Sequence, residues 1–146
     1  MEFNELDAMS RPLLDKFYKA QRSGMRSAGE GRWWVARESE IVAGLSLTPI
    51  ADGHWLTGLL VAAPVRGRGI ARLLLDRAQV AVDGPLWLFC HPDLQGFYGH
   101  LGFMPSTELP AQLQQRLARY QASKPLVAME RVSRPGWDRD LETALR

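Results

Sequence analysis

The sequence has few of the features that mark secreted or membrane proteins. It contains one cysteine, Cys90, in 146 residues, so no internal disulfide can form and we expect a reducing compartment. No apolar run approaches the roughly 20 residues that a membrane helix needs. The acidic start at residues 1–5 lacks the basic and apolar pattern of a secretory signal. We therefore expect a cytoplasmic protein without a membrane partner.

An excess of one charge is also missing. The formal net charge is +2, and nowhere do five or six basic residues occur together as in a nucleic-acid-binding tail. Hydrophobic residues make up 46% and charged residues 23% of the chain, which is typical of a folded globular protein. Without internal repeats or low-complexity linkers, we predict one domain over 1–146, with a core at about 5–132 and a polar tail at 133–146.

The spacing of the apolar residues predicts a mixed α/β fold. We expect helices at 5–25 (or from Ser10 as the cap, with Pro12 in the first turn), 70–81, 91–101 and 109–122, and strands at 32–37, 40–47, 54–62, 86–90 and 124–132. Short turns between the first three strands imply antiparallel pairing. The strand–helix–strand segment 54–90 implies one parallel, right-handed crossover. The charge-free run 86–90 is typical of a strand buried on both faces.

A basic, glycine-rich turn follows the apolar segment 54–62. Residues 66–71 read RGRGIA, and the helix expected from Ile70 begins within them. The first N–H groups of a helix lack intrahelical partners and lie at the positive end of its dipole. Glycines let a ligand approach the backbone closely and arginines add positive charge. The pattern therefore predicts a phosphate-binding site.

Two common phosphate-binding motifs do not fit this turn. A Walker-type loop requires a Gly-Lys pair, which the sequence lacks. A dinucleotide fingerprint requires a third glycine where Arg72 stands, and an acidic residue about 20 positions later, where residues 89–91 read FCH. The turn instead matches Arg/Gln-x-x-Gly-x-Gly/Ala and resembles the GNAT superfamily of N-acetyltransferases, in which it holds the pyrophosphate of coenzyme A. Taken alone, the motif also fits a basic turn that only caps a helix.

A second segment resembles the same family. Residues 97–103 read FYGHLGF, as in the Phe-Tyr-x-x-x-Gly-Phe motif that follows the fifth strand of GNAT proteins. It comes about 30 residues after the glycine turn, with an expected helix and strand between them. The order of elements is that of the family, and the resemblance covers roughly residues 32–132.

The resemblance implies a fold, a cofactor and a catalytic group. We expect a GNAT-like α/β fold whose mixed, mainly antiparallel central sheet has flanking helices and a splayed strand pair, 54–62 and 86–90, that holds acetyl-CoA. Tyr98 is expected to protonate the departing thiolate, because a phenol of pKa near 10 is protonated at neutral pH; a packing aromatic is the alternative. The residues expected to contact coenzyme A are Leu60, Val61, Arg66, Gly67, Arg68, Gly69, Ile70, Ala71 and His91.

The sequence departs from the family pattern at several places, two of which bear on cofactor binding and on the first strand. His91 stands where the family often has an asparagine, which alters the hydrogen bonding expected around the pantetheine arm. Only residues 1–3 are available for the strand that usually precedes the first helix, so we expect that strand to be short or missing.

Other reactive side chains carry weaker hypotheses. His54, His91 and Asp52 are candidate general bases by position only, and a surface or core role is expected for each. Cys90 could carry the acetyl group covalently, but a small buried thiol is the favoured interpretation, so we expect direct transfer in a ternary complex. The histidines and Cys90 lack metal-ligand spacing, and we expect no metal. Core packing is the default for Trp33, Trp34, Trp55 and Trp87, with an acceptor pocket as the alternative.

The sequence thus predicts an acetyl-CoA-dependent N-acetyltransferase acting on a primary amine. A module that binds acyl-CoA as a sensor without catalysis is the main alternative, and a nucleic-acid-binding domain that uses Arg66–Arg72 is a lesser one. The acceptor stays open between a peptide N-terminus, a lysine side chain, a polyamine, an amino acid and an antibiotic. The oligomeric state is open too, although many relatives form homodimers.

Overall fold

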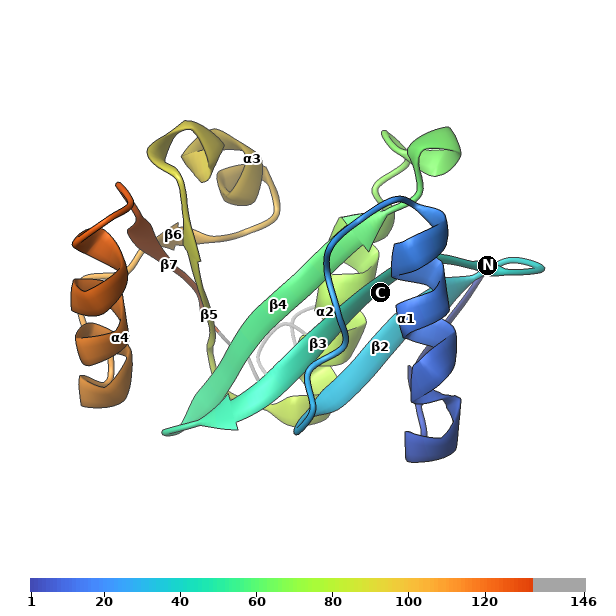
Figure 1. Ribbon diagram of the computed structural model, residues 1–146, viewed down its shortest axis with the longest axis horizontal. Coiled ribbons are helices and arrows are strands. Elements are labelled where there is room, and N and C mark those ends of the chain that lie inside the picture. The colour runs from blue at the N-terminus through green and yellow to red at the C-terminus, as the bar shows by residue number, and fades with distance from the viewer. Residues whose placement is uncertain (133–146) are drawn as a thin grey trace, which may run out of the picture.

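A seven-stranded sheet runs through the molecule in the order β1-β2-β3-β4-β5-β7-β6. The computed structural model describes residues 1–132, and the predicted tail at 133–146 lies outside them. The strands are β1 (Glu2–Leu6), β2 (Arg32–Arg37), β3 (Ile41–Ile50), β4 (Gly53–Val61), β5 (Leu86–Cys90), β6 (Met104–Pro105) and β7 (Val127–Arg131). Every neighbouring pair is antiparallel except β4–β5 (Figure 1). The predicted mixed, mainly antiparallel sheet is confirmed.

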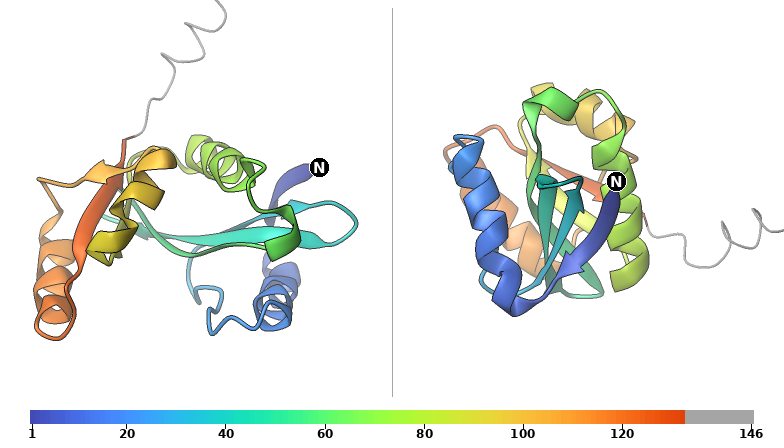
Figure 2. Two further views of the ribbon diagram at one scale, coloured as in Figure 1. Left: turned by 90° about the horizontal axis from the view of Figure 1, so that it is seen from above. Right: turned by 90° about the vertical axis from the view of Figure 1, so that its right-hand side faces the viewer.

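Helices lie on both faces of this sheet. α1 (Arg11–Ala20) and α4 (Ala111–Gln121) lie on one face, on either side of β4, and α2 (Ile70–Val82) covers the other (Figure 2). α3 (Gln95–His100) lies beside the first turn of α2, where the Arg72 guanidinium donates to the carbonyl of His100 at 2.9 Å. Three short 3₁₀ helices complete the path: η1 (Ala8–Ser10), η2 (Ala63–Val65) and η3 (Pro92–Leu94).

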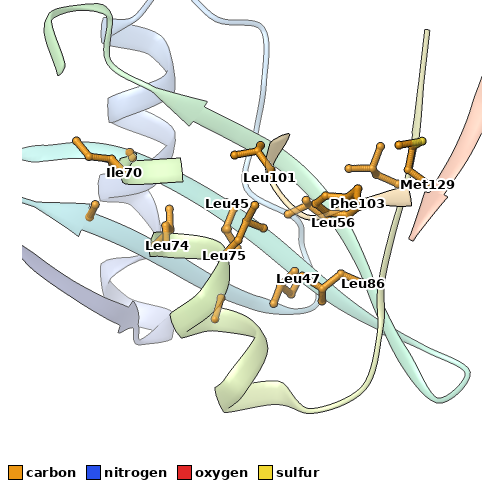
Figure 3. Packing of buried hydrophobic residues seen from close by; sticks show 14 of the residues in the cluster. Leu45, Leu47, Leu56, Ile70, Leu74, Leu75, Leu86, Leu101, Phe103 and Met129 are labelled. Atoms are coloured by element: carbon orange, nitrogen blue, oxygen red, sulfur yellow. The ribbon is translucent and has the colours of Figure 1, made fainter. Parts of the chain in front are cut away.

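Two buried apolar clusters hold the helices against the sheet. In the larger cluster, Leu74 and Leu75 of α2 are fully buried against the central strands (Figure 3). Burying one leucine side chain contributes about 2 kcal/mol. Members of this cluster are Leu45, Leu47, Leu56, Ile70, Leu74, Leu75, Leu86, Leu101, Phe103 and Met129. The smaller cluster packs Leu14 and Tyr18 of α1 against Val35 of β2, so each face of the sheet has its own core.

The N-terminal strand corrects two expectations. Residues 2–6 form β1 and pair with β2 over its whole length, so the prediction of a short or missing first strand is wrong. The helix begins at Arg11, which agrees with the alternative prediction of Ser10 as the cap and contradicts a start at residue 5. The pairing of residues 2–6 with β2 outweighs the weak helical spacing of the apolar residues in this segment. The Asp7 carboxylate accepts a hydrogen bond from the Ser10 N–H at 2.8 Å and begins the helical turn, whereas the Ser10 side chain makes no capping bond.

The remaining elements agree with the expected ones within a few residues. β3 extends to Ile50, because the turn between β3 and β4 narrows to residues 51 and 52. β6 was not expected, since two residues carry no periodic signal. In β5 only Phe89 is half-exposed, as its charge-free run predicted.

Candidate active site

The parallel strands β4 and β5 separate into a fork. They pair only at His54–Leu86 and Trp55–Trp87. Beyond Trp55, β4 continues to Val61 without a partner on the β5 side, and β5 turns to β7 instead. The splayed pair expected for this fold is therefore present, closed at Trp55 and open toward the N-terminal end of α2 (Figure 1).

A β-bulge in β4 bends the strand within the fork. The β3–β4 register shifts by one residue at Gly58 and Leu59, and a bulge increases local twist and bends its strand. Gly58 has φ +68°, a conformation that favours glycine. The buried Tyr18 hydroxyl donates to the Gly58 carbonyl at 2.6 Å. Burial raises the pKa of Tyr18, and the nearby Asp15 charge adds to this, so the hydroxyl keeps its proton and the bond.

An open anion-binding turn lies between β4 and α2. Gly67 and Gly69 both adopt positive φ, +80° and +75°, which turns the backbone into the helix. The N–H groups of residues 67–72 donate no hydrogen bond to any acceptor in the described part of the chain, residues 1–132. A Cβ placed on either glycine would meet nothing within 4 Å. The turn therefore presents free donors at a helix N-terminus to open space, the chemistry that suits a phosphate group.

Arg66 secures this turn to the end of β4. Its Nε donates to the carbonyl of Val61 at 2.9 Å. Arg68 lies next in the turn and is exposed. The two arginines therefore differ: the side chain of Arg66 is anchored to the protein, whereas that of Arg68 projects from the turn.

Tyr98 and Cys90 lie together at the open end of the fork. Tyr98 is half-buried and packs edge-on against Phe103, with ring centroids 5.8 Å apart. Burial raises the pKa of Tyr98, and the neighbouring Cys90 reinforces the shift. Burial also raises the pKa of the Cys90 thiol. Both groups are protonated at neutral pH, so Tyr98 is a proton donor and Cys90 is a poor nucleophile.

A charged network behind Tyr98 fixes α3 against α2 and β7. The buried Arg131 side chain donates to the Leu101 carbonyl at 2.9 Å and to Gln79 Oε1 at 2.7 Å, and it pairs with Asp76. Sequence reasoning missed this arginine, whose only signal was a charge at the end of an apolar strand. It also missed Tyr18 and Gly58, although an isolated glycine inside a strand pattern indicates a bulge.

The three candidate bases lie at different ends of the fork. His54 is at the closed end, where burial and the Arg32 charge lower the pKa of its ring. Asp52 is exposed in the β3–β4 turn beside it. His91 follows β5 at the open end, and its Nδ1 accepts from the Asp93 N–H at 3.1 Å. Only His91 therefore lies at the same end of the fork as Tyr98.

Two further features are absent from the described residues 1–132. None of the helices there is long and apolar enough to cross a bilayer. No group of three or more His, Cys, Asp or Glu side chains in the same residues is arranged to hold a metal ion.

A forked parallel pair with an anion-binding turn at its open end defines the GNAT fold class, and solved structures share it. The Tetrahymena GCN5 structure has a TM-score of 0.69 at 14% identity and covers 92% of this chain and 98% of its own. The structure of ElaA from Escherichia coli has a TM-score of 0.62 at 20% identity and covers 90% of this chain and 99% of its own. The structure of Rv2747 from Mycobacterium tuberculosis, solved with CoA and NLQ, has a TM-score of 0.63 at 16% identity and covers 92% of this chain and 100% of its own.

Sequence comparison establishes the family. The model of the acetyltransferase (GNAT) domain matches residues 29–105, more than half of the chain. The chain therefore belongs to the GNAT acetyltransferase family. No curated protein matches its sequence.

Proposed function

We propose that this protein transfers an acetyl group from acetyl-CoA to a primary amine, directly within a ternary complex. The observation that carries this proposal is the convergence of three features at one end of the fork: the free N–H groups of residues 67–72, the unpaired edge of β4 and the protonated phenol of Tyr98. The N–H groups suit the pyrophosphate of an acyl-CoA, and the phenol suits the sulfur of its thioester. The CoA named in the M. tuberculosis structure, which shares this fold, supports the assignment.

The glycine turn fits the pyrophosphate of coenzyme A. Gly67, Gly69, Ile70 and Ala71 would bind its oxygens through backbone N–H groups, since these donors have no acceptor in residues 1–132 and the space at both glycines is open. Arg68 would add a charge from its exposed position. Because Arg66 is bound to Val61, it would act mainly by holding the turn in shape.

The β4 edge and His91 would hold the pantetheine arm. Backbone groups of Leu60 and Val61 lie on the part of β4 that has no β5 partner and can pair with the pantetheine amides. His91 Nδ1 accepts the Asp93 N–H, so the neutral ring carries its proton on Nε2. That N–H can replace the amide donor of the asparagine that the family often has at this position.

The chemical step requires one proton donor and one proton acceptor. When bound, acetyl-CoA supplies a carbonyl carbon to which the amine nitrogen bonds as the carbon–sulfur bond breaks. Tyr98 then gives its hydroxyl proton to the departing sulfur and regains one from solvent. The pKa of Tyr98 is raised, so the donor form is present at and below neutral pH. The ammonium proton leaves through water, because His91, the candidate base nearest in the fold to Tyr98, already accepts the Asp93 N–H at Nδ1 and carries its own proton on Nε2.

A thiol-release assay tests the proposal. Acetyl-CoA is offered with a panel of amines, and binding of CoA is measured separately by calorimetry. We expect CoA to bind and at least one amine to be acetylated with stoichiometric release of thiol. Binding of CoA without turnover of any amine would favour the sensor alternative, and failure of CoA to bind would refute both.

A further inference from the structure

Aromatic side chains line the closed end of the fork on the face that carries α1 and α4. Trp55 of β4 and Phe89 of β5 meet edge to face, with ring centroids 4.6 Å apart. Phe89 in turn meets Tyr120 of α4 at 6.2 Å. Trp55 and Phe89 are half-exposed, and Tyr120 is 45% exposed. Three rings from three elements thus form an accessible aromatic floor, defined here as Trp55, Phe89 and Tyr120.

This floor lies on the side from which an acceptor can reach the fork. Leu56, Leu86 and Leu88 belong to the core beneath α2, so α2 closes the opposite face. The floor begins three residues before the bulge at Gly58, about 10 Å along the strand. An aromatic ring that rests against this floor can therefore belong to a molecule whose amine reaches the bulged part of β4.

A single guanidinium lies over the floor. Arg116 precedes Tyr120 by one turn of α4, and its guanidinium carbon is 5.4 Å from the centre of the Trp55 ring. Within the described residues 1–132, it has no carboxylate or hydrogen-bond partner. A guanidinium held by an aromatic face keeps its in-plane N–H donors available, and their geometry matches a carboxylate.

Two carboxylates on the same face accept hydrogen bonds from neighbouring groups. Glu130 accepts a hydrogen bond from Trp87 Nε1 at 2.6 Å. Asp15 of α1 accepts from both the N–H and the hydroxyl of Ser27, at 2.7 and 2.9 Å. The charge that lies directly over the floor is the Arg116 guanidinium. The floor is therefore complementary to an acceptor that carries a negative charge.

We infer that the acceptor is an aromatic α-amino acid, whose ring rests on the Trp55–Phe89–Tyr120 floor and whose carboxylate binds Arg116. The inference rests on the proposed function, since it names the amine that enters the fork. The α-amino group would point along β4 toward the bulge. A polyamine lacks both the ring and the carboxylate that this site accepts.

Acceptor kinetics with L-phenylalanine, L-phenylalaninamide and spermidine test the inference. The amide keeps the ring and the amine but lacks the carboxylate. For the unaltered protein we expect KM for L-phenylalanine to be at least tenfold below that for the amide, with spermidine the poorest acceptor. Arg116→Gln should raise KM for L-phenylalanine tenfold or more and leave KM for the amide and for acetyl-CoA unchanged.

Arg77→Gln is the matched control. Arg77 also lies over an aromatic ring, 5.3 Å from the centre of Phe3, but it belongs to α2 on the opposite face. This variant should leave every KM unchanged. An equal response to both substitutions, or a preference for spermidine, would overturn the inference.

Calorimetry separates failure of this inference from failure of the proposed function. If another amine is acetylated and L-phenylalanine is not, the inference fails while the function stands. If no amine is acetylated, the proposed function fails, and titration of L-phenylalanine into the CoA-saturated protein decides the inference. If L-phenylalanine binds, and this binding is lost in Arg116→Gln and kept in Arg77→Gln, the site is supported. If L-phenylalanine does not bind, the inference is refuted.

Discussion

The two ends of the β4–β5 fork are built differently. At the closed end, His54 and Trp55 pair with β5, and the Arg32 side chain joins Glu5 of β1 to the carbonyl of Ala81 at the end of α2. At the open end, the N–H groups of residues 67–72 lack acceptors among the described residues 1–132. The closed end therefore joins its strands to α2 through internal hydrogen bonds, whereas the open end leaves donors for a ligand.

The difference assigns coenzyme binding and proton transfer to the open end, and stability to the Arg32–Glu5 network at the closed end. Changes in that network, which contacts α2 on the face opposite the aromatic floor, should shift the free energy of unfolding and leave the kinetics of the folded protein unaltered. Changes at the open end should do the reverse, because its groups have few internal partners to lose. The Tyr18–Gly58 bond lies between the two ends, and it should couple stability to kinetics.

The largest effect is expected at the open end, from Tyr98→Phe. Removing the hydroxyl deletes the proposed proton donor, and such donors contribute about a hundredfold or more to rate. We expect kcat to fall by about that factor while KM for acetyl-CoA and the unfolding midpoint stay close to those of the unaltered protein. Steady-state kinetics and urea denaturation measure the two quantities. A variant that retains full kcat would reduce Tyr98 to a packing residue.

The pH dependence sharpens this prediction. Burial raises the pKa of Tyr98 above its usual value near 10, so the phenol is a donor below that pKa and loses the role only as pH rises through it. The unaltered protein should therefore show no decline in kcat from loss of this proton between pH 7 and 9. A decline within that range that Tyr98→Phe abolishes would contradict the raised pKa.

The bulge between the two ends gives the next largest effect. An alanine at Gly58 would place its Cβ 2.5 Å from the Tyr18 hydroxyl, at φ +68°. Left-handed strain and overpacking together destabilise by about 3 kcal/mol, and the bent strand should also raise KM for acetyl-CoA. Gly24→Ala, at a site with no neighbour within 4 Å, is the control for both measurements.

A double variant tests whether Tyr18 is the cause. Tyr18→Phe alone removes one buried hydrogen bond, worth about 1 kcal/mol. Combined with Gly58→Ala, it also removes the atom that the new methyl group meets first. The double variant should therefore lose less unfolding free energy than the two single variants lose when their losses are added. If the two losses simply add in the double variant, the new methyl group clashes with an atom other than the Tyr18 hydroxyl.

Sequence reasoning located the open end better than the rest of the site. The glycine turn and Tyr98 were predicted because local backbone chemistry specifies them: two glycines in left-handed conformation begin a helix. Whether they bind an acyl-CoA stays a prediction. Tyr18 and Arg131 were missed because their roles depend on partners 40 or more positions away, at Gly58 and Asp76. No local pattern announces such contacts.

A moderate effect on ligand binding alone is expected from Gly69→Ala. The residue has φ +75°, and its added methyl group would project into the open turn without meeting protein atoms. The left-handed conformation costs about 1 kcal/mol, so unfolding changes little. The methyl group and the strained backbone should weaken CoA binding about tenfold, equivalent to 1.4 kcal/mol. If calorimetry shows unchanged affinity for CoA, the pyrophosphate does not bind at this turn.

The smallest effect is expected at the closed end, from Glu5→Gln. Its carboxylate accepts from Arg32 Nε at 2.7 Å, and this hydrogen bond lowers the pKa of Glu5 below 4.5. The stabilisation is therefore complete above about pH 4.5 and is lost as pH falls through the folded-state pKa. Because both side chains are about one-third exposed, solvent screening limits the pair to about 0.5 kcal/mol.

Urea denaturation at two pH values measures this small difference. At pH 7, Glu5→Gln should be less stable than the unaltered protein by that amount, and at pH 3 the gap should narrow, with kcat unaffected throughout. Glu2→Gln, in the same strand and exposed, is the matched control and should change neither quantity. A loss of kcat in Glu5→Gln, at unchanged stability, would show that the closed end takes part in the chemistry and would remove the distinction between the two ends of the fork.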